Sequence, residues 1–233
     1  MDTSDSDVDG LDVVNNGTGT LSITLDSADI DTADDLSFTG TGDIELTVVG
    51  SVDLTGDILT AVTQITIDGN STLTITHDQF LALGAANILP DSDPATTGNL
   101  NIVGLGSEPF NASGIPAGIN VNVVTLEDGD VVLDPSTNLT GVDQLVVPEG
   151  GSVTLTAAQY QQLLGSGTIV GIDADGDPTS DFSVHITGLR QADVDRNLGA
   201  AAFTGSEDGF DLSLVTADEI TITLGEPTVT LGK

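Results

Sequence analysis

The chain has 233 residues, and 37 acidic residues against three basic ones give it a formal net charge of −34. This charge excludes nucleic acid and anionic membrane surfaces as partners, because both are bound through clusters of Lys and Arg. It also opposes a compact fold by self-repulsion, so we expect bound cations or high salt to offset it. Because the chain has no cysteine, packing, repeats or metal must hold the fold in place of disulfides.

Short stretches of alternating apolar and polar residues predict β-strands separated by turns rich in Gly, Asn and Asp. Besides the strands in the two segments 62–84 and 142–165, which are described next, the predicted strands in chain order are 11–14, 21–25, 36–38, 44–46, 52–54, 59–62, 100–105, 121–126, 131–133, 168–172, 182–189 and 210–214. Short helices are expected at 78–83, which Gly84 ends, and at 191–202. No apolar run reaches the ~18 residues that a membrane-spanning helix needs, so no membrane insertion is expected.

One pattern occurs twice, at Val62–Gly84 and at Val142–Gly165, and each copy indicates strand, Gly-rich corner, strand and a short helix. A third copy begins at Ala217, and the core of the unit also occurs at Ala33. Repetition of this kind is typical of proteins built from stacked units. We therefore predict that the chain is an excerpt of a longer protein and that residues 1–233 form one continuous β-repeat array, with copies near 33–61, 62–141, 142–216 and a truncated 217–233.

Strand–corner–strand units that recur every 20–30 residues or so predict an all-β chain folded as a parallel β-solenoid (β-helix) with short helical insertions. Apolar side chains of each unit would point inward and stack on those of the next unit. The alternative is a pair of tandem Ig-like β-sandwiches, since each long copy has the length of a small domain. A sandwich needs antiparallel pairs, whereas the same short unit repeated within one copy favours parallel stacking.

Two features of the repeat indicate structural roles. Gln79 and Phe80 align with Gln159 and Tyr160, and we expect the aromatic ring to pack over the open side of a coil while the glutamine bonds backbone at a corner. Pairs of threonines lie opposite the apolar positions of their strands and are predicted to face outward. Such pairs resemble the ice-binding ladders of solenoid antifreeze proteins, although threonine suits any exposed strand. The pairs are Thr74/Thr76, Thr154/Thr156 and Thr221/Thr223.

Two loops carry aspartates at alternate positions with a glycine among or after them, as at the start of calcium-binding loops. Carboxylates at this spacing converge on one ion, while glycine permits the bend. Both loops lack the distal glutamate of a complete EF-hand loop, and solvated acidic turns are the alternative interpretation. The predicted calcium ligands are Asp5, Asp7, Asp9, Asp173, Asp175, Asp177 and Asp181.

No residue pattern points to catalysis, and the chain is predicted not to be an enzyme. His77 and His185 are the only histidines, and the repeat does not require His77 because Ala157 aligns with it. We find no Ser/His/Asp order, no zinc spacing and no phosphate-binding glycine loop. A β-helix polysaccharide-degrading enzyme remains as an alternative, because solenoids of this kind also carry such activities.

The pattern LT-x-T-x-x-Q-(F/Y)-x-x-L occurs at 73–83 and, with Val153 in place of the first leucine, at 153–163. It resembles the repeats of large acidic secreted bacterial surface proteins, including S-layer-like proteins and giant type I-secreted adhesins. The resemblance covers residues 62–105 and 142–189. It implies a non-enzymatic, extracellular, cell-surface protein stabilised by calcium. Such a protein would self-associate into a surface layer, filament or matrix; the alternative is an adhesin segment that binds glycan or ice.

Overall fold

The computed structural model describes residues 11–27, 35–93, 95–125, 130–163, 167–172, 178–179, 181–190 and 219–224. Strands make up 53% of the structure and helices 11%, so the predicted all-β class is confirmed. The chain divides into two compact units, which are described separately below. Unit 1 comprises residues 1–103 and 114–122, and unit 2 comprises residues 104–113 and 123–233.

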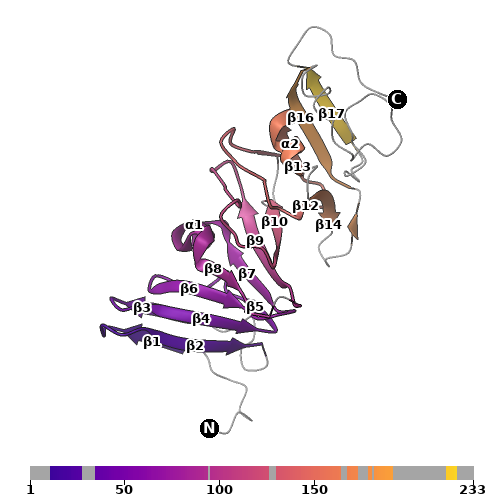
Figure 1. The fold of residues 1–233 in the computed structure, drawn as a ribbon. Helices are drawn as coiled ribbons and strands as arrows, with labels where there is room; N and C mark the ends of the chain where they lie inside the picture. The colour runs from indigo at the N-terminus through magenta and orange to yellow at the C-terminus, as the bar shows by residue number, and fades with distance from the viewer. Residues whose placement is uncertain are drawn as a thin grey trace. The chain divides into compact units, whose positions relative to one another are not determined.

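Unit 1 is built from short strands and one short helix (Figure 1). In chain order they are β1 (Leu11–Asn15), β2 (Leu21–Asp26), β3 (Leu36–Gly40), β4 (Ile44–Val49), β5 (Ser51–Asp53), β6 (Val62–Ile67), β7 (Thr72–Thr76), α1 (His77–Leu83), the 3₁₀ turn η1 (Ala85–Asn87), β8 (Ile88–Pro90), and most of β9 (Gly98–Leu105) and β10 (Ile119–Thr125).

Strands of unit 1 pair in parallel with strands that lie one repeat further along the chain. Figure 1 shows β2, β4, β6 and β8 one above another. Leu21 pairs with Ile44 and Ile44 with Val62, and a one-residue shift at Thr63 then places Glu45 opposite Gln64. A second set runs from β5 through β7 to β9, with Val52 opposite Leu73 and Leu73 opposite Leu100. β1 pairs with β3 in the same parallel sense. These pairings do not match an Ig-like sandwich, whose neighbouring strands are antiparallel.

Alternation along β4 and its neighbours places aliphatic side chains inside the stack. Buried and half-buried residues alternate without a break along β4. Leu46, Ile65 and Ile88 occupy successive strands in register and are at most 1% exposed. Burying a side chain of this size contributes roughly 1.5–3 kcal/mol. The column therefore explains how a chain with few aromatic residues forms a core.

The helix predicted at 78–83 is confirmed as α1 and begins one residue earlier. The Thr76 side chain accepts a hydrogen bond from the Gln79 N–H (3.1 Å), while Gln79 Oε1 accepts one from the Thr76 N–H (2.7 Å). This reciprocal capping box satisfies two of the N–H groups that a helix start leaves open. The Gly84 N–H bonds the Phe80 carbonyl, and φ is 84° at Gly84, a conformation that glycine adopts readily.

The side chain of Gln79 also links α1 to the preceding turn. Its Nε2 donates to the carbonyl oxygens of Leu54 (2.5 Å) and Asp57 (3.0 Å), which belong to the turn after β5. Phe80 is 2% exposed. The predicted bonding of this glutamine to backbone is therefore confirmed in the first copy, and the aromatic ring beside it is buried.

Unit 2 repeats this organisation (Figure 1). Its remaining elements are β11 (Asp130–Val132), β12 (Gln144–Pro148), β13 (Ser152–Thr156), α2 (Ala157–Leu163), β14 (Thr168–Ile172), β15 (Pro178–Thr179), β16 (Ser183–Leu189) and β17 (Glu219–Leu224). The register runs in parallel from β11 through β13 and β16 to β17, and β12 pairs in parallel with β14. The short β15 pairs antiparallel with β14.

The second copy of the repeat contains the same glutamine contact. Gln159 Nε2 donates to the carbonyl oxygens of Asp134 (2.7 Å) and Thr137 (3.3 Å), and its Oε1 accepts from the Thr156 N–H (2.8 Å). Tyr160 is fully buried, as Phe80 nearly is. The glutamine and the aromatic residue therefore perform the same structural role in both units.

The structural repeat extends further upstream than the sequence pattern. A parallel bridge joins Ser37 to Ile58 in unit 1, and a corresponding bridge joins Asn111 to Asn138 in unit 2. Beside these bridges, side chains of different types accept equivalent backbone hydrogen bonds. The Asp57 carboxylate accepts from the Leu36 N–H (2.8 Å), and the Thr137 hydroxyl accepts from the Phe110 N–H (3.2 Å).

Not every predicted element can be compared with the structure. The helix expected at 191–202 and the strand expected at 210–214 lie outside the described residues. The third copy of the repeat does form a strand, β17, which pairs with β16.

Candidate functional site

Six of the seven predicted calcium ligands lie outside the described residues: Asp5, Asp7, Asp9, Asp173, Asp175 and Asp177. The seventh, Asp181, is described and exposed. Its N–H donates to Thr179 Oγ1 (3.1 Å), and its carbonyl oxygen accepts from the Gly150 N–H (2.5 Å). Within the described parts of the chain, no group of three or more acidic or histidine side chains is placed to hold a metal ion. Calcium binding therefore stays a prediction.

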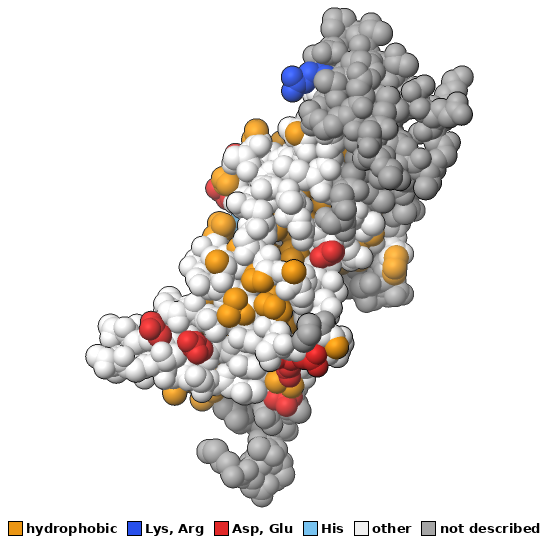
Figure 2. Space-filling model, in the orientation of Figure 1, with side chains coloured by type: hydrophobic (Ala, Val, Ile, Leu, Met, Phe, Trp, Pro, Cys, Tyr) orange, Lys and Arg blue, Asp and Glu red, His pale blue; other side chains and the backbone are white. Residues whose placement is uncertain are grey.

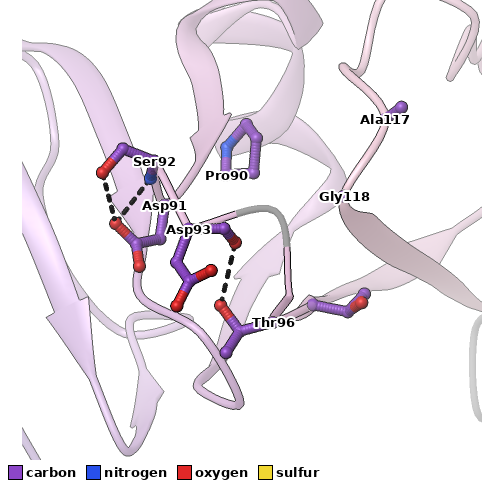
Figure 3. A pocket seen from close by; sticks show the side chains of 8 residues that line it. Pro90, Asp91, Ser92, Asp93, Thr96, Ala117 and Gly118 are labelled. Carbon is purple, nitrogen blue, oxygen red and sulfur yellow. Dashed lines mark hydrogen bonds between the residues drawn. The ribbon is translucent and has the colours of Figure 1, made fainter.

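A pocket of about 340 Å³ lies in unit 1 beside the loop that joins β8 to β9 (Figure 3). Asp91 and Asp93 face it from this loop, and Ala117 and Gly118, just before β10, form the opposite wall. The loop has two aspartates at alternate positions, one fewer than each of the predicted calcium loops at 5–9 and 173–177.

Hydrogen bonds within the loop occupy part of each carboxylate, and Figure 3 draws those to Asp91. Asp91 Oδ1 accepts from the N–H (2.5 Å) and the hydroxyl (3.4 Å) of Ser92. Asp93 Oδ1 accepts from the Ala95 N–H (2.9 Å), and the Asp93 carbonyl accepts from the Thr96 hydroxyl (3.2 Å). These contacts are those of self-stabilised acidic turns. The pocket presents oxygen atoms but no histidine or basic side chain, so its chemistry suits a cation or a hydroxyl-bearing ligand.

A second polar feature of unit 1 is an uncharged array on the outward side of β7, β9 and β10. The register places Thr72 beside Asn99 and Thr74 beside Asn101. Amide groups continue both columns onto β10, since Asn120 Nδ2 donates to Asn99 Oδ1 (3.1 Å) and Asn122 Nδ2 donates to Asn101 Oδ1 (3.0 Å). We call these six residues the amide–threonine array: Thr72, Thr74, Asn99, Asn101, Asn120 and Asn122.

The array is regular because parallel strands hold it. Neighbouring strands lie about 4.8 Å apart, and residues on one face of a strand repeat about every 6.6 Å. Asn101 Nδ2 also reaches Thr74 Oγ1 (3.4 Å), so the column is bonded along its length. The sequence predicted that Thr74 faces outward, and it is half-buried between the fully buried Leu73 and Ile75. The asparagine columns were missed, because register cannot be read from one strand.

A threonine column crosses β2, β4 and β6. Thr24, Thr47 and Thr66 lie in register on successive strands, and the column ends at Leu89 on β8. The neighbouring column is mixed, with Ser22, Glu45 and Gln64. On the face that Figure 2 shows, acidic side chains are scattered and most of the described surface is uncharged.

The two histidines lie in different units. His77 begins α1 and is buried, whereas His185 is half-buried on β16, in register with Thr154 and Thr221.

Among the acidic side chains of unit 2, Asp134 has its pKa held below the ordinary value by hydrogen bonds from the side chain and then the backbone of Ser136. That carboxylate is half-buried and caps its own turn.

Comparison with protein-family models, with curated proteins and with solved structures gives no significant match. None of the helices in the described ranges is long and apolar enough to cross a membrane. The function must therefore be argued from the geometry above.

Proposed function

We propose that this chain is a non-enzymatic structural segment of an extracellular surface protein, folded as a parallel β-solenoid and serving in a layer, filament or matrix that assembles from copies of itself. The observation that supports this proposal is the in-register parallel pairing of the strands of each sequence repeat with those of the next repeat. Each strand of such a stack depends on its neighbours, so stability grows with the number of coils and no coil is stable alone.

Side chains reinforce the stack at the corners. Gln79 and Gln159 each donate two hydrogen bonds to the turn of the preceding coil, and the asparagines of the amide–threonine array bond one strand to the next. These contacts run along the direction of stacking. They would resist separation of the coils, which is what a load-bearing or spacing element requires.

Calcium belongs to this proposal as the agent that offsets the net charge of −34. The acidic turns at 5–9 and 173–181 would bind the ion, and neutralisation would let copies of the chain approach each other. Without a counter-ion, like charges would keep the copies apart.

The decisive experiment is sedimentation and negative-stain imaging of the purified chain in EDTA and in millimolar calcium. The proposal expects single particles in EDTA and ordered polymers or sheets in calcium. Particles that remain monomeric under both conditions, with an unchanged melting temperature, would contradict both the assembly and the role of calcium.

The amide–threonine array supports a second candidate, an adhesin segment that binds a neutral glycan or ice. The array carries no charge in a very acidic chain, and it presents amide and hydroxyl groups at regular spacing. Asn120→Asp and Thr72→Asp would each introduce a charge into it. Retention on an insoluble neutral polysaccharide, or thermal hysteresis, that both substitutions abolish would favour this candidate; retention unaffected by both would reject it.

A further inference from the structure

A second pocket in unit 1, of about 380 Å³, lies beside α1. Its wall is largely apolar, and Ile58 is 51% exposed there. The residues used in the argument below are Asp57, Ile58, Leu59, Asp78 and Ala82. The pocket shares none of its lining residues with the loop pocket of Figure 3 or with the amide–threonine array.

The second copy of the repeat shows what fills the equivalent place in unit 2. In the overlay of the two copies, Leu59 aligns with Leu139 and Ala82 with Gln162. The turns match, since the carbonyl oxygen of Leu59 accepts from the Val62 N–H (3.0 Å) and that of Leu139 accepts from its counterpart (3.1 Å). In unit 2, Gln162 Oε1 accepts a hydrogen bond from the Leu139 N–H (2.8 Å).

Unit 1 lacks this side chain. Ala82 ends at its Cβ and lines the open pocket in place of the glutamine. As a consequence Leu59 is half-buried, whereas Leu139 is fully buried. Among the described residues, no acceptor receives a hydrogen bond from the Leu59 N–H. The pocket therefore combines an apolar wall with a backbone donor at the position where unit 2 places an amide oxygen.

We propose that this pocket is a carboxamide-binding site that receives a glutamine or asparagine side chain from a peptide segment of a partner protein. The amide oxygen of the guest accepts a hydrogen bond from the Leu59 N–H, as Gln162 Oε1 accepts one from the Leu139 N–H, and the methylene stem of the guest packs on Ile58 and Leu59. Asp57 and Asp78 also line the pocket, so they repel a carboxylate of the same length. The site thus prefers glutamine to glutamate, although both side chains carry acceptor oxygens.

The test uses small probes on the whole chain, with the Leu59 amide resonance as the readout. The protein is titrated separately with N-acetylglutaminamide, with N-acetylleucinamide and with the glutamate analogue. The three probes share the same backbone acceptors and differ in their side chains. We expect the glutamine probe to move the Leu59 resonance and to bind at least about fivefold more tightly than either analogue, the value of one net hydrogen bond. Absence of a Leu59 response, equal binding of the three probes, or tighter binding of N-acetylglucosamine would overturn the proposal.

A pair of reciprocal substitutions provides the control. Ala82→Gln should fill the pocket from within, slow hydrogen exchange of the Leu59 amide about fivefold and abolish the response to the probe. Gln162→Ala should open the equivalent pocket in unit 2 and make the Leu139 amide responsive. If Gln162→Ala fails to fold, Ala82→Gln decides alone: a probe response that persists in this variant would show that the ligand binds elsewhere.

Discussion

Replacing Gln159 by glutamate separates the two tasks of this side chain. The new carboxylate can still accept from the Thr156 N–H, and glutamate is the residue that a capping box commonly uses. It cannot donate to the carbonyl oxygens of Asp134 and Thr137, which would then face a negative charge. The substitution therefore keeps the helix cap and removes the bonds from α2 to the turn after β11.

The magnitude follows from burial. Gln159 is 2% exposed, so the loss of two donor bonds and the burial of a charge should destabilise unit 2 by about 2–4 kcal/mol at pH 7. In a unit of this size such a loss lowers Tm by about 10 °C or more. Gln144→Glu is the matched control, because Gln144 is exposed on β12 and the variant adds the same charge at the surface.

The pH dependence gives a second check on the same variant. Burial and the facing carbonyl oxygens raise the folded-state pKa of the introduced glutamate above its unfolded value near 4.3. The destabilisation relative to wild type is therefore smallest below pH ~4, where the protonated acid can donate again, and it grows as pH rises through the raised pKa. Chemical denaturation at pH 4 and pH 7 measures this difference. A Gln159→Glu variant as stable as Gln144→Glu at pH 7 would refute the claim that this glutamine joins α2 to the turn after β11.

Three further predictions address the core, the backbone and the metal. Ile75→Asp should unfold unit 1, because Ile75 is fully buried, whereas Thr74→Asp on the opposite, half-buried face should cost far less even with Asp53 in register beside it; equal losses of circular dichroism would show that the facing is wrong. Gly171→Ala should destabilise unit 2 by about 1–3 kcal/mol, since the added Cβ would overlap the Phe182 ring. In the control Gly19→Ala the added Cβ meets no atom within 4 Å, so this variant should be neutral; denaturant melts distinguish the two outcomes. Chelation should lower Tm by about 5 °C if calcium occupies the acidic turns, and identical melts in EDTA and calcium would remove the metal from the account.

The elements that the sequence predicted well are those whose signal is local. The alternation around Leu73 and Ile75 identified a strand with one buried face, and the helix predicted at 78–83 with Gly84 as its stop lies within one residue of α1. The role of Gln159 was also predictable, because the same residue occurs at the same place in both copies.

Other features depend on register or on residues that differ between copies. Asp57 and Thr137 accept equivalent backbone hydrogen bonds, yet a carboxylate and a hydroxyl share no sequence signal. The asparagine columns of the amide–threonine array became apparent only when β9 lay beside β7. The contrast between Ala82 and Gln162 was visible in the overlay, but its meaning required the Leu139 hydrogen bond.

The central claim, that successive segments stack in parallel and in register, is tested most directly by disulfide trapping, which this cysteine-free chain permits without background. Thr47 and Thr66 are direct neighbours on adjacent strands, so their Cα atoms lie about 4.8 Å apart, within the range that a disulfide spans. Thr24 and Thr66 lie two strands apart, at about twice that distance. Under mild oxidation the stack predicts rapid closure in Thr47→Cys/Thr66→Cys and none in Thr24→Cys/Thr66→Cys. Closure only in the second pair, or equal closure in both, would contradict the parallel register.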